Sequence, residues 1–380
     1  MLMDENVHNP NNPENSHDQK NNYHKSNDGN VAQSDAESTS SISHKVTLNF
    51  SDGVSKEFQV EPNRNILDAA LANDIPLLYQ CRSGSCSSCI CTLKEGEAST
   101  LEGKSSTLLA SEYNLGNRLL CVSKADVDCS FDLAYGSDIG AVSAQEVKAF
   151  INSIEQLGAN AVRLKLELAD GYDMQFRPGQ FMQINIPDVG VLRSYSPSST
   201  NINIPELEFL IRLIPDGKMS TYLTDHAKVD DVLTLSGPYG SFFLREEHKR
   251  AKHIFIAGGT GLAPILSIID TLRQSSGVKP KMLLNFGCAT PDALFCLDDI
   301  ALRSQWLPSL EARICVDREA QEGHHAGSPV SALSEADITD SDTVAYLCGP
   351  QPMINAATAR LLELGVKAEN IFAEQFVASH

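Results

Sequence analysis

The pattern of apolar and polar positions changes several times along the chain. Residues 1–44 contain almost no large apolar side chains and are rich in Asn, Ser and Asp. Such a segment cannot bury enough apolar surface to offset the entropy of ordering, so we predict a disordered tail. From Lys45 onward, apolar residues alternate with polar ones over 46–50 and 58–60, on either side of a Ser-Asp-Gly turn. This pattern predicts a β-hairpin.

A short helix and further strands follow the hairpin. Asn65 can cap a helix that ends near Asn73, because apolar residues recur on one helical face after it. A cysteine-rich loop comes next, and then short strands, one of them in the apolar run 118–122. Together these elements predict a small α+β domain over residues 45–136, followed by a short linker at 137–144.

Two further patterns divide the rest of the chain. Alternating runs separated by turns predict an antiparallel β-barrel over residues 145–246, with strands at 163–168, 181–186, 207–213 and 231–235. Residues 247–380 alternate strand and helix instead, with strands at 253–257, 281–287 and 343–347 and helices at 263–273 and 352–364. That order predicts an α/β domain built on a parallel sheet with covering helices.

Composition and charge exclude several classes of function. The 380 residues carry a net charge of −19, which argues against a protein that binds nucleic acid through its phosphates. No apolar stretch is long and unbroken enough to span a bilayer, and the N-terminus has no basic and apolar segments of a secretory signal. We therefore expect a cytoplasmic protein without membrane or nucleic-acid partners, whose ten cysteines stay reduced.

The cysteine loop carries the most specific chemistry. Cys81, Cys86 and Cys89 follow the spacing C-x4-C-x2-C, and Cys121 lies further on in the strand-like run. This is the plant-type spacing for a [2Fe–2S] cluster, whose two tetrahedral irons need four thiolates. Small residues between the cysteines let backbone N–H groups turn inward and hydrogen-bond the sulfides of the cluster. The alternatives are zinc, although zinc sites usually carry two C-x2-C pairs, and buried thiols that bind nothing.

Residues 45–135 thus resemble the plant-type ferredoxin domain, which implies a β-grasp fold. Cys91 and Cys129 stand outside the motif. For both, packing as small apolar side chains is the expected role.

Two motifs in the predicted barrel point to a flavin. Arg193-Ser194-Tyr195-Ser196 stands at the predicted start of a strand, and Gly217-Lys218-Met219-Ser220 opens a helix. A guanidinium fork and a helix N-terminus both suit a diphosphate, but each motif alone is weak. In this order they resemble the FAD domain of the ferredoxin–NAD(P)H reductase superfamily, an antiparallel Greek-key barrel. The resemblance implies that Arg193 and Ser220 bind the FAD diphosphate, that Tyr195 covers the isoalloxazine, and that Ser196 lies near the reactive ring nitrogen.

Three motifs in the last domain point to a nicotinamide coenzyme. Gly258-Gly259-Thr260-Gly261 follows a strand and precedes a helix, where glycines let a pyrophosphate approach backbone amides. Cys348-Gly349-Pro350 ends another strand, and Glu374-Gln375-Phe376 lies near the C-terminus. The same superfamily has such a cysteine beside the nicotinamide, and an acid and an aromatic ring close to the flavin. The resemblance thus adds Cys348, Glu374 and Phe376 to Ser196 as catalytic residues.

The choice of coenzyme rests on residues 285–290, which contain no basic side chain for a 2′-phosphate. This favours NADH, with Arg318 as a possible counter-signal. A flavin accepts a hydride and releases single electrons, so it must stand between NADH and the cluster. The order of the three parts resembles reductase components of bacterial multicomponent oxygenases. The resemblance implies a monomer that passes electrons from NADH through FAD and [2Fe–2S] to a Rieske dioxygenase or a diiron hydroxylase. A deoxysugar dehydratase is the alternative partner.

Overall fold

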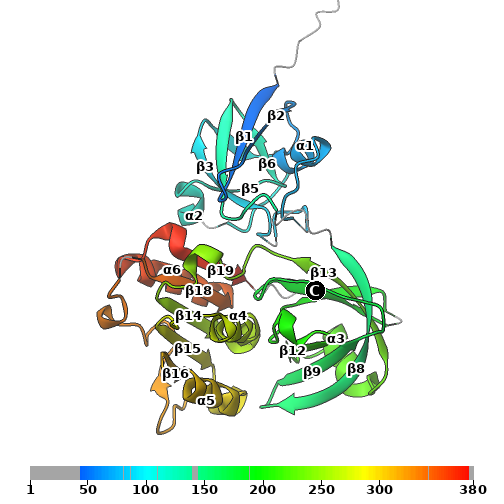
Figure 1. The fold of residues 1–380 in the computed structure, drawn as a ribbon, viewed down its shortest axis with the longest axis vertical. Helices are drawn as coiled ribbons and strands as arrows, with labels where there is room; N and C mark the ends of the chain where they lie inside the picture. Colours follow the sequence, from blue (N-terminus) through cyan, green and yellow to red (C-terminus); the bar gives the residue numbers. More distant parts are fainter. Residues whose placement is uncertain are drawn as a thin grey trace, which may run out of the picture. The chain divides into compact units, whose positions relative to one another are not determined.

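The computed structural model describes residues 43–79, 81–85, 87–108, 110–138, 144–187, 189–340 and 342–375. Most of the predicted tail and of the predicted linker therefore lies outside the described residues. The described chain forms three main sheets, each with its own apolar core (Figure 1). Among the described helices, none has the length and apolar character needed to cross a membrane.

The first sheet has the strand order β2-β1-β7-β3-β5, with helix α1 packed on it. Alternate residues of β1 (Val46, Leu48 and Phe50) are buried, which is why the hairpin forms with this register. The Asn65 side chain accepts the N–H of Asp68 at 2.7 Å and caps α1, as predicted. The elements are β1 (His44–Phe50), β2 (Ser55–Val60), α1 (Ile66–Ala72), β3 (Ile90–Glu95), β4 (Ala98–Thr100), α2 (Ala110–Asn114), β5 (Asn117–Leu119), β6 (Ser123–Ala125) and β7 (Cys129–Leu133).

One predicted strand of this region is wrong. The apolar run 118–122 does not form a single strand, because β5 ends at Leu119 and β6 begins at Ser123. Cys121 lies in the turn between them, where the Val122 N–H donates to the Leu119 carbonyl at 3.0 Å. The run is apolar because Leu119, Leu120 and Val122 are all buried, not because it alternates between two faces of a sheet.

The second sheet is antiparallel throughout, in the order β11-β10-β13-β8-β9-β12. A bridge between Pro197 and Phe209 joins its two edges and closes the predicted barrel around its own apolar core. The elements are β8 (Gln145–Leu157), β9 (Ala161–Leu168), β10 (Phe181–Ile186), β11 (Val191–Tyr195), β12 (Glu206–Arg212), α3 (Lys218–Thr221), the π-helix η3 (Tyr222–His226) and β13 (Val232–Tyr239).

The third sheet is parallel throughout, in the order β17-β16-β15-β14-β18-β19, as predicted. Its central strand β14 is buried on both faces, which explains its continuous apolar run. Helix α4 packs on one face and α6 on the other. The elements are β14 (His253–Gly258), α4 (Leu262–Gln274), β15 (Met282–Cys288), α5 (Leu297–Trp306), β16 (Leu310–Val316), β17 (His325–Ala326), β18 (Val344–Gly349), α6 (Gln351–Glu363) and β19 (Ile371–Gln375).

Short 3₁₀ helices lie in the connections of the second and third sheets. They are η2 (Asn201–Asn203), η4 (Glu246–His248), η5 (Gly259–Gly261), η6 (Pro291–Ala293), η7 (Glu335–Asp337) and η8 (Ala368–Asn370). Of these, η5 coincides with the predicted glycine turn, so that turn leads directly from β14 into α4.

Candidate functional site

The cysteines of the motif come from two separate turns. Cys81 and Cys89 lie in the loop between α1 and β3, and Cys121 lies between β5 and β6. The thiol of Cys121 interacts with the thiols of both Cys81 and Cys89, which raises the pKa of Cys121. Cys86, the fourth predicted ligand, lies outside the described residues. In the described part of the motif, Cys121 therefore lies beside both Cys81 and Cys89, although the described residues alone contain no group of three that could hold a metal ion.

Backbone N–H groups of the cysteine loop point inward at the Cys81 sulfur. The small residues between the cysteines predicted this inward turn. The N–H groups of Ser83 and Ser85 donate to the Cys81 sulfur at 3.4 and 3.3 Å. Gly84 lies between them with φ of +79°, and a Cβ on it would stand 2.2 Å from the Ser105 carbonyl oxygen. Only glycine fits this position. Neighbouring thiols with amide donors are a donor set that suits a [2Fe–2S] cluster.

The two cysteines outside the motif lie in the core. Cys91 and Cys129 are buried on β3 and β7. The Cys91 thiol donates to the Arg118 carbonyl at 3.5 Å, and burial raises the pKa of both thiols. They pack as small apolar side chains.

The first flavin motif lies along β11. Arg193 stands in the middle of this strand and Tyr195 ends it, so the prediction that the motif starts a strand is wrong. The alternation of exposed and half-buried residues in β11 leaves Ser194 exposed and packs Tyr195 against the barrel core, where burial raises the pKa of its phenol. Ser196, just beyond the strand, is buried.

The second flavin motif is the N-terminus of α3. Gly217 is the residue before the helix, and Lys218, Met219 and Ser220 form its first turn, as predicted. Met219 packs into the barrel core, and the Ser220 hydroxyl accepts the N–H of Ile214 at 2.7 Å. This bond ties the helix start to the beginning of the loop that leads from β12 to α3.

A partly buried carboxyl joins the barrel to the third sheet. The Ser196 hydroxyl donates to Glu374 at 3.2 Å. Glu374 lies on β19 and stands opposite Cys348 of β18 in the strand register. Burial raises the pKa of Glu374 to about 8, against the Ser196 hydrogen bond, and burial with Glu374 nearby raises the pKa of Cys348. Of the four predicted catalytic residues the structure thus brings three together, while Phe376 lies outside the described residues.

The glycine turn and the Cys348 turn touch through their backbones. A Cβ on Gly261 would lie 2.2 Å from the Cys348 carbonyl oxygen, and one on Gly258 would lie 2.9 Å from the ring of Pro350. Gly349 has φ of +154°, and a Cβ on it would lie 3.1 Å from the backbone nitrogen of Gly258. The glycines in both motifs are therefore needed so that the carboxyl ends of β14 and β18 can meet, which is where ligands of parallel sheets bind.

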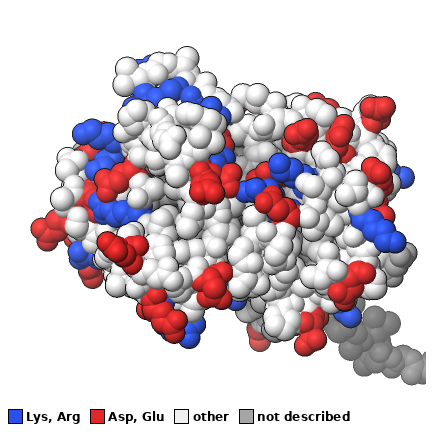
Figure 2. Space-filling view, turned by 90° about the horizontal axis from the view of Figure 1, so that it is seen from below, with Lys and Arg blue, Asp and Glu red and all other residues white. Residues whose placement is uncertain are grey.

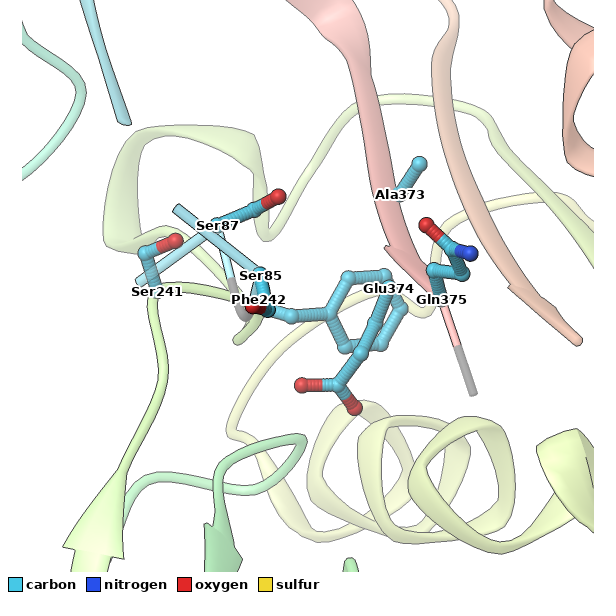
Figure 3. A pocket seen from close by; sticks show the side chains of 7 residues that line it. All are labelled: Ser85, Ser87, Ser241, Phe242, Ala373, Glu374 and Gln375. Carbon is cyan, nitrogen blue, oxygen red and sulfur yellow. The ribbon is translucent and has the colours of Figure 1, made fainter. Parts of the chain in front are cut away.

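A pocket connects these motifs to the cysteine loop. Its lining comes from the cysteine loop, from the segment after β13, and from β19 (Figure 3): Ser85, Ser87, Ser241, Phe242, Ala373, Glu374 and Gln375. Sequence reasoning missed Ser241 and Phe242. The run Gly-Pro-Tyr-Gly-Ser-Phe-Phe at 237–243 is the signal that marks them, because two aromatic residues follow a glycine turn between strands.

The Glu374 carboxyl gives the FAD-free protein a specific pH dependence. Its pKa is about 8 in the folded protein and about 4.5 in the unfolded chain, so folding favours the protonated carboxyl. Its contribution is complete below pH 4.5 and is lost as the pH rises toward 8. We expect the free energy of unfolding to fall by about 3 kcal/mol more for the native protein than for Glu374→Gln between pH 5 and 8, in urea titrations. Parallel pH curves for the two proteins would contradict this.

Comparisons with known proteins agree with the three sheets. Residues 49–126 match the 2Fe-2S iron-sulfur cluster binding domain, residues 148–244 the oxidoreductase FAD-binding domain, and residues 255–359 the oxidoreductase NAD-binding domain. The propane 2-monooxygenase reductase component of Mycolicibacterium smegmatis is 33% identical over 88% of this chain and 98% of its own. The toluate 1,2-dioxygenase electron transfer component of Pseudomonas putida is 30% identical over 89% of this chain and 100% of its own. A solved ferredoxin reductase of carbazole 1,9a-dioxygenase is 26% identical, with a TM-score of 0.60 over 88% of this chain and 99% of that one.

Proposed function

Because the chain belongs to the family of iron–sulfur flavoprotein reductases that are electron transfer components of oxygenases, we propose that it carries electrons from NADH to the terminal oxygenase of such a system. The observation that carries the proposal is the pocket that Ser85 and Ser87 of the cysteine loop share with Glu374. It means that the residues around the cluster and those around the flavin face one space.

Each group of site residues has a proposed task. Cys81, Cys86, Cys89 and Cys121 hold the [2Fe–2S] cluster. The FAD is held by Arg193, Ser194, Tyr195, Ser196, Gly217, Lys218, Met219 and Ser220, and the NADH by Gly258, Gly259, Thr260, Gly261, Cys348, Gly349 and Pro350. When bound, the flavin accepts a hydride and releases single electrons. Ser196 and Glu374 hold a proton beside the flavin site, since they share a part-buried hydrogen bond and the raised pKa of Glu374 keeps its carboxyl protonated at neutral pH.

The division of the chain is part of the proposal. Residues 45–136 form the ferredoxin domain, 145–246 the FAD domain and 247–380 the NAD domain. Because one chain carries all three cofactor sites, we propose that it works as a monomer, which light scattering during size-exclusion chromatography would check. Reduced thiols, as a cluster requires, fit the cytoplasm.

The proposed partner is a terminal oxygenase. The charge distribution on the surface does not distinguish a Rieske dioxygenase from a diiron hydroxylase. Acidic side chains lie in separate groups over the face seen in Figure 2 and are interspersed with Lys and Arg. Named relatives serve both a dioxygenase and a monooxygenase. Assays with a purified Rieske dioxygenase and a purified diiron hydroxylase would distinguish the two partner types.

An anaerobic visible spectrum before and after NADH tests the electron path, together with iron and FAD analysis. We expect about two irons and one FAD per chain, by the stoichiometry of the two cofactors, and both chromophores should bleach with NADH. Zinc in place of iron, or a flavin that NADH does not bleach, would overturn the proposal.

Replacing Cys348 by alanine tests the proposed nicotinamide site. The thiol is fully buried on a residue that stands opposite Glu374 and whose backbone meets the glycine turn, so its loss should disturb how the nicotinamide meets the flavin. We expect NADH to reduce the flavin about tenfold more slowly in stopped-flow absorbance, or about 1.4 kcal/mol in barrier, with unchanged FAD content.

The matched control is Cys315→Ala. Cys315 is also fully buried in the third sheet, but β15 and β14 separate its strand from β18. Flavin reduction at the native rate in Cys348→Ala would return Cys348 to a packing role.

A further inference from the structure

The segment that links β13 to β14 contributes side chains to two separate apolar cores, that of the third sheet and that of residues 46–135. After Ser241, which lines the pocket at the cysteine loop, Phe242 turns toward the third sheet, where its ring lies 5.6 Å from that of Tyr346. Phe243 points elsewhere and is buried in the apolar core of residues 46–135. Leu244 returns to the core of the third sheet. Side chains of an extended segment alternate in direction, and here the alternation sends them into different domains.

Phe243 has a special place in the first core. Among the described residues, it is the one member of that core that comes from beyond Tyr135. Only about 1% of it is exposed. A second cavity beside it is lined by Asp52 and Tyr135 on one side and by Arg177 and Arg245 on the other. Phe243 is therefore the described residue through which this core makes apolar contact with the rest of the chain.

Two guanidinium groups hold the ring. The Arg245 guanidinium carbon lies 3.8 Å from the centre of the Phe243 ring, and that of Arg177 lies 5.4 Å from it. Arg245 is 96% buried, since its exposed fraction is 4%. Its guanidinium donates to the Ser241 carbonyl at 2.7 Å, and its backbone N–H donates to the Tyr346 hydroxyl at 3.2 Å. No carboxylate of the described residues forms an ion pair with it, so the face of Phe243 is a main partner of this buried cation.

Arg177 extends the contact to the segment that follows the ferredoxin domain. Its guanidinium lies 3.6 Å from the carboxylate of Asp138. The pair is exposed and therefore weak. The apolar ring, not the ion pair, is thus the main candidate for fixing this contact.

We propose that Phe243 is a positioning residue that locks the ferredoxin domain in place, so that the cysteine loop stays on the flavin side of the shared pocket. Ser241 and Phe243 are two residues apart, which couples the insertion of the ring to the position of the segment that faces Ser85 and Ser87. Electron transfer through protein slows steeply with distance, so a small displacement of the loop has a large effect. This inference rests on the proposed electron path.

The test compares Phe243→Ala with Phe58→Ala in the full chain with its cofactors. Phe58 is buried in the same core but on β2, in the hairpin, so its loss removes similar apolar burial without touching the link. Hydrogen exchange of residues 131–138 should become at least tenfold faster in Phe243→Ala than in Phe58→Ala at equal overall stability. Stopped-flow absorbance should show flavin reduction by NADH within twofold of native, and electron transfer to the cluster at least tenfold slower, with unchanged iron content.

Phe243→Leu keeps an apolar side chain in the core and should give intermediate exchange and an intermediate transfer rate. It replaces Phe243→Ala if that variant does not fold. Native exchange and native transfer in the Phe243 variants would overturn the proposal. If NADH never reduces the cluster in the native protein, the proposed electron path is overturned instead. The hydrogen-exchange data would still decide whether Phe243 holds the ferredoxin domain in place.

Discussion

Cys121→Ser is expected to abolish electron delivery to cluster-dependent one-electron acceptors while NADH still reduces the flavin. The thiol of Cys121 interacts with those of Cys81 and Cys89, so its loss opens the donor set on one side. A hydroxyl is a poor ligand for the iron of such a cluster, which prefers thiolates. We expect cytochrome c reduction to fall at least a hundredfold, about 2.7 kcal/mol in barrier, and the iron content to fall with it.

Cys129→Ser is the matched control for this variant. Cys129 is buried in the same core but lies outside the motif. It should retain its iron and its cytochrome c reduction, at a modest cost in stability. Loss of flavin reduction in Cys121→Ser would show that the cluster and flavin sites do not act separately, contrary to the proposed path.

Gly261→Ala should have the second large effect, on the use of NADH. The backbone of Gly261 has an ordinary helical conformation, so alanine is not excluded by φ. The obstacle is contact, because the new Cβ would stand 2.2 Å from the carbonyl oxygen of Cys348. Either the glycine turn or the end of β18 must move, and overpacking of this kind typically costs about 1–3 kcal/mol. We expect NADH to reduce the flavin at least tenfold more slowly, with FAD still bound.

Gly277→Ala separates this contact from a general effect of alanine. Gly277 has φ of +90° but nothing near its Cβ position, so the substitution strains only the backbone of an exposed turn. It should lower the melting temperature slightly and leave flavin reduction by NADH unchanged. An equal loss of rate in both variants would mean that the close approach of the two turns has no role in binding NADH.

The sequence predicts best those helices and strands whose buried residues recur with a single regular spacing along the element. Strand β10 occupies its predicted range, and β14 and α4 differ from theirs by a residue at an end, since one or both faces are buried. Strand β8 was missed. A register shift between Ile151 and Ser153 interrupts its alternation, and Phe150 is apolar yet exposed. Helix α5 was missed because Ile300 is its only fully buried residue, so it has little apolar stripe to detect.

The site divides in the same way. Motifs that lie close together in the sequence, such as the cysteine loop and the glycine turn, are visible as spacing. The pocket that joins them is not, because its lining comes from Ser85 and Ser87, from residues 241–242 and from residues 373–375. No local pattern records that these three segments meet. Glu374 was assigned only through resemblance. In the sequence, a glutamate that turns inward cannot be told from one that faces solvent, because its partner Ser196 lies far away along the chain.

The pairing of β1 with β7 has a consequence for how the protein is made. Val46 to Phe50 pair with Cys129 to Leu133, and β1 is an inner strand that needs this neighbour. On the ribosome, the first domain therefore cannot close until about eighty residues beyond β1 have emerged, and contacts of such long sequence separation form slowly. Cys81 and Cys89 are synthesised well before Cys121 and β7. Iron loading must therefore await the synthesis of Cys121 and β7, and a ribosome that stalls before β7 leaves reactive thiols on an open chain.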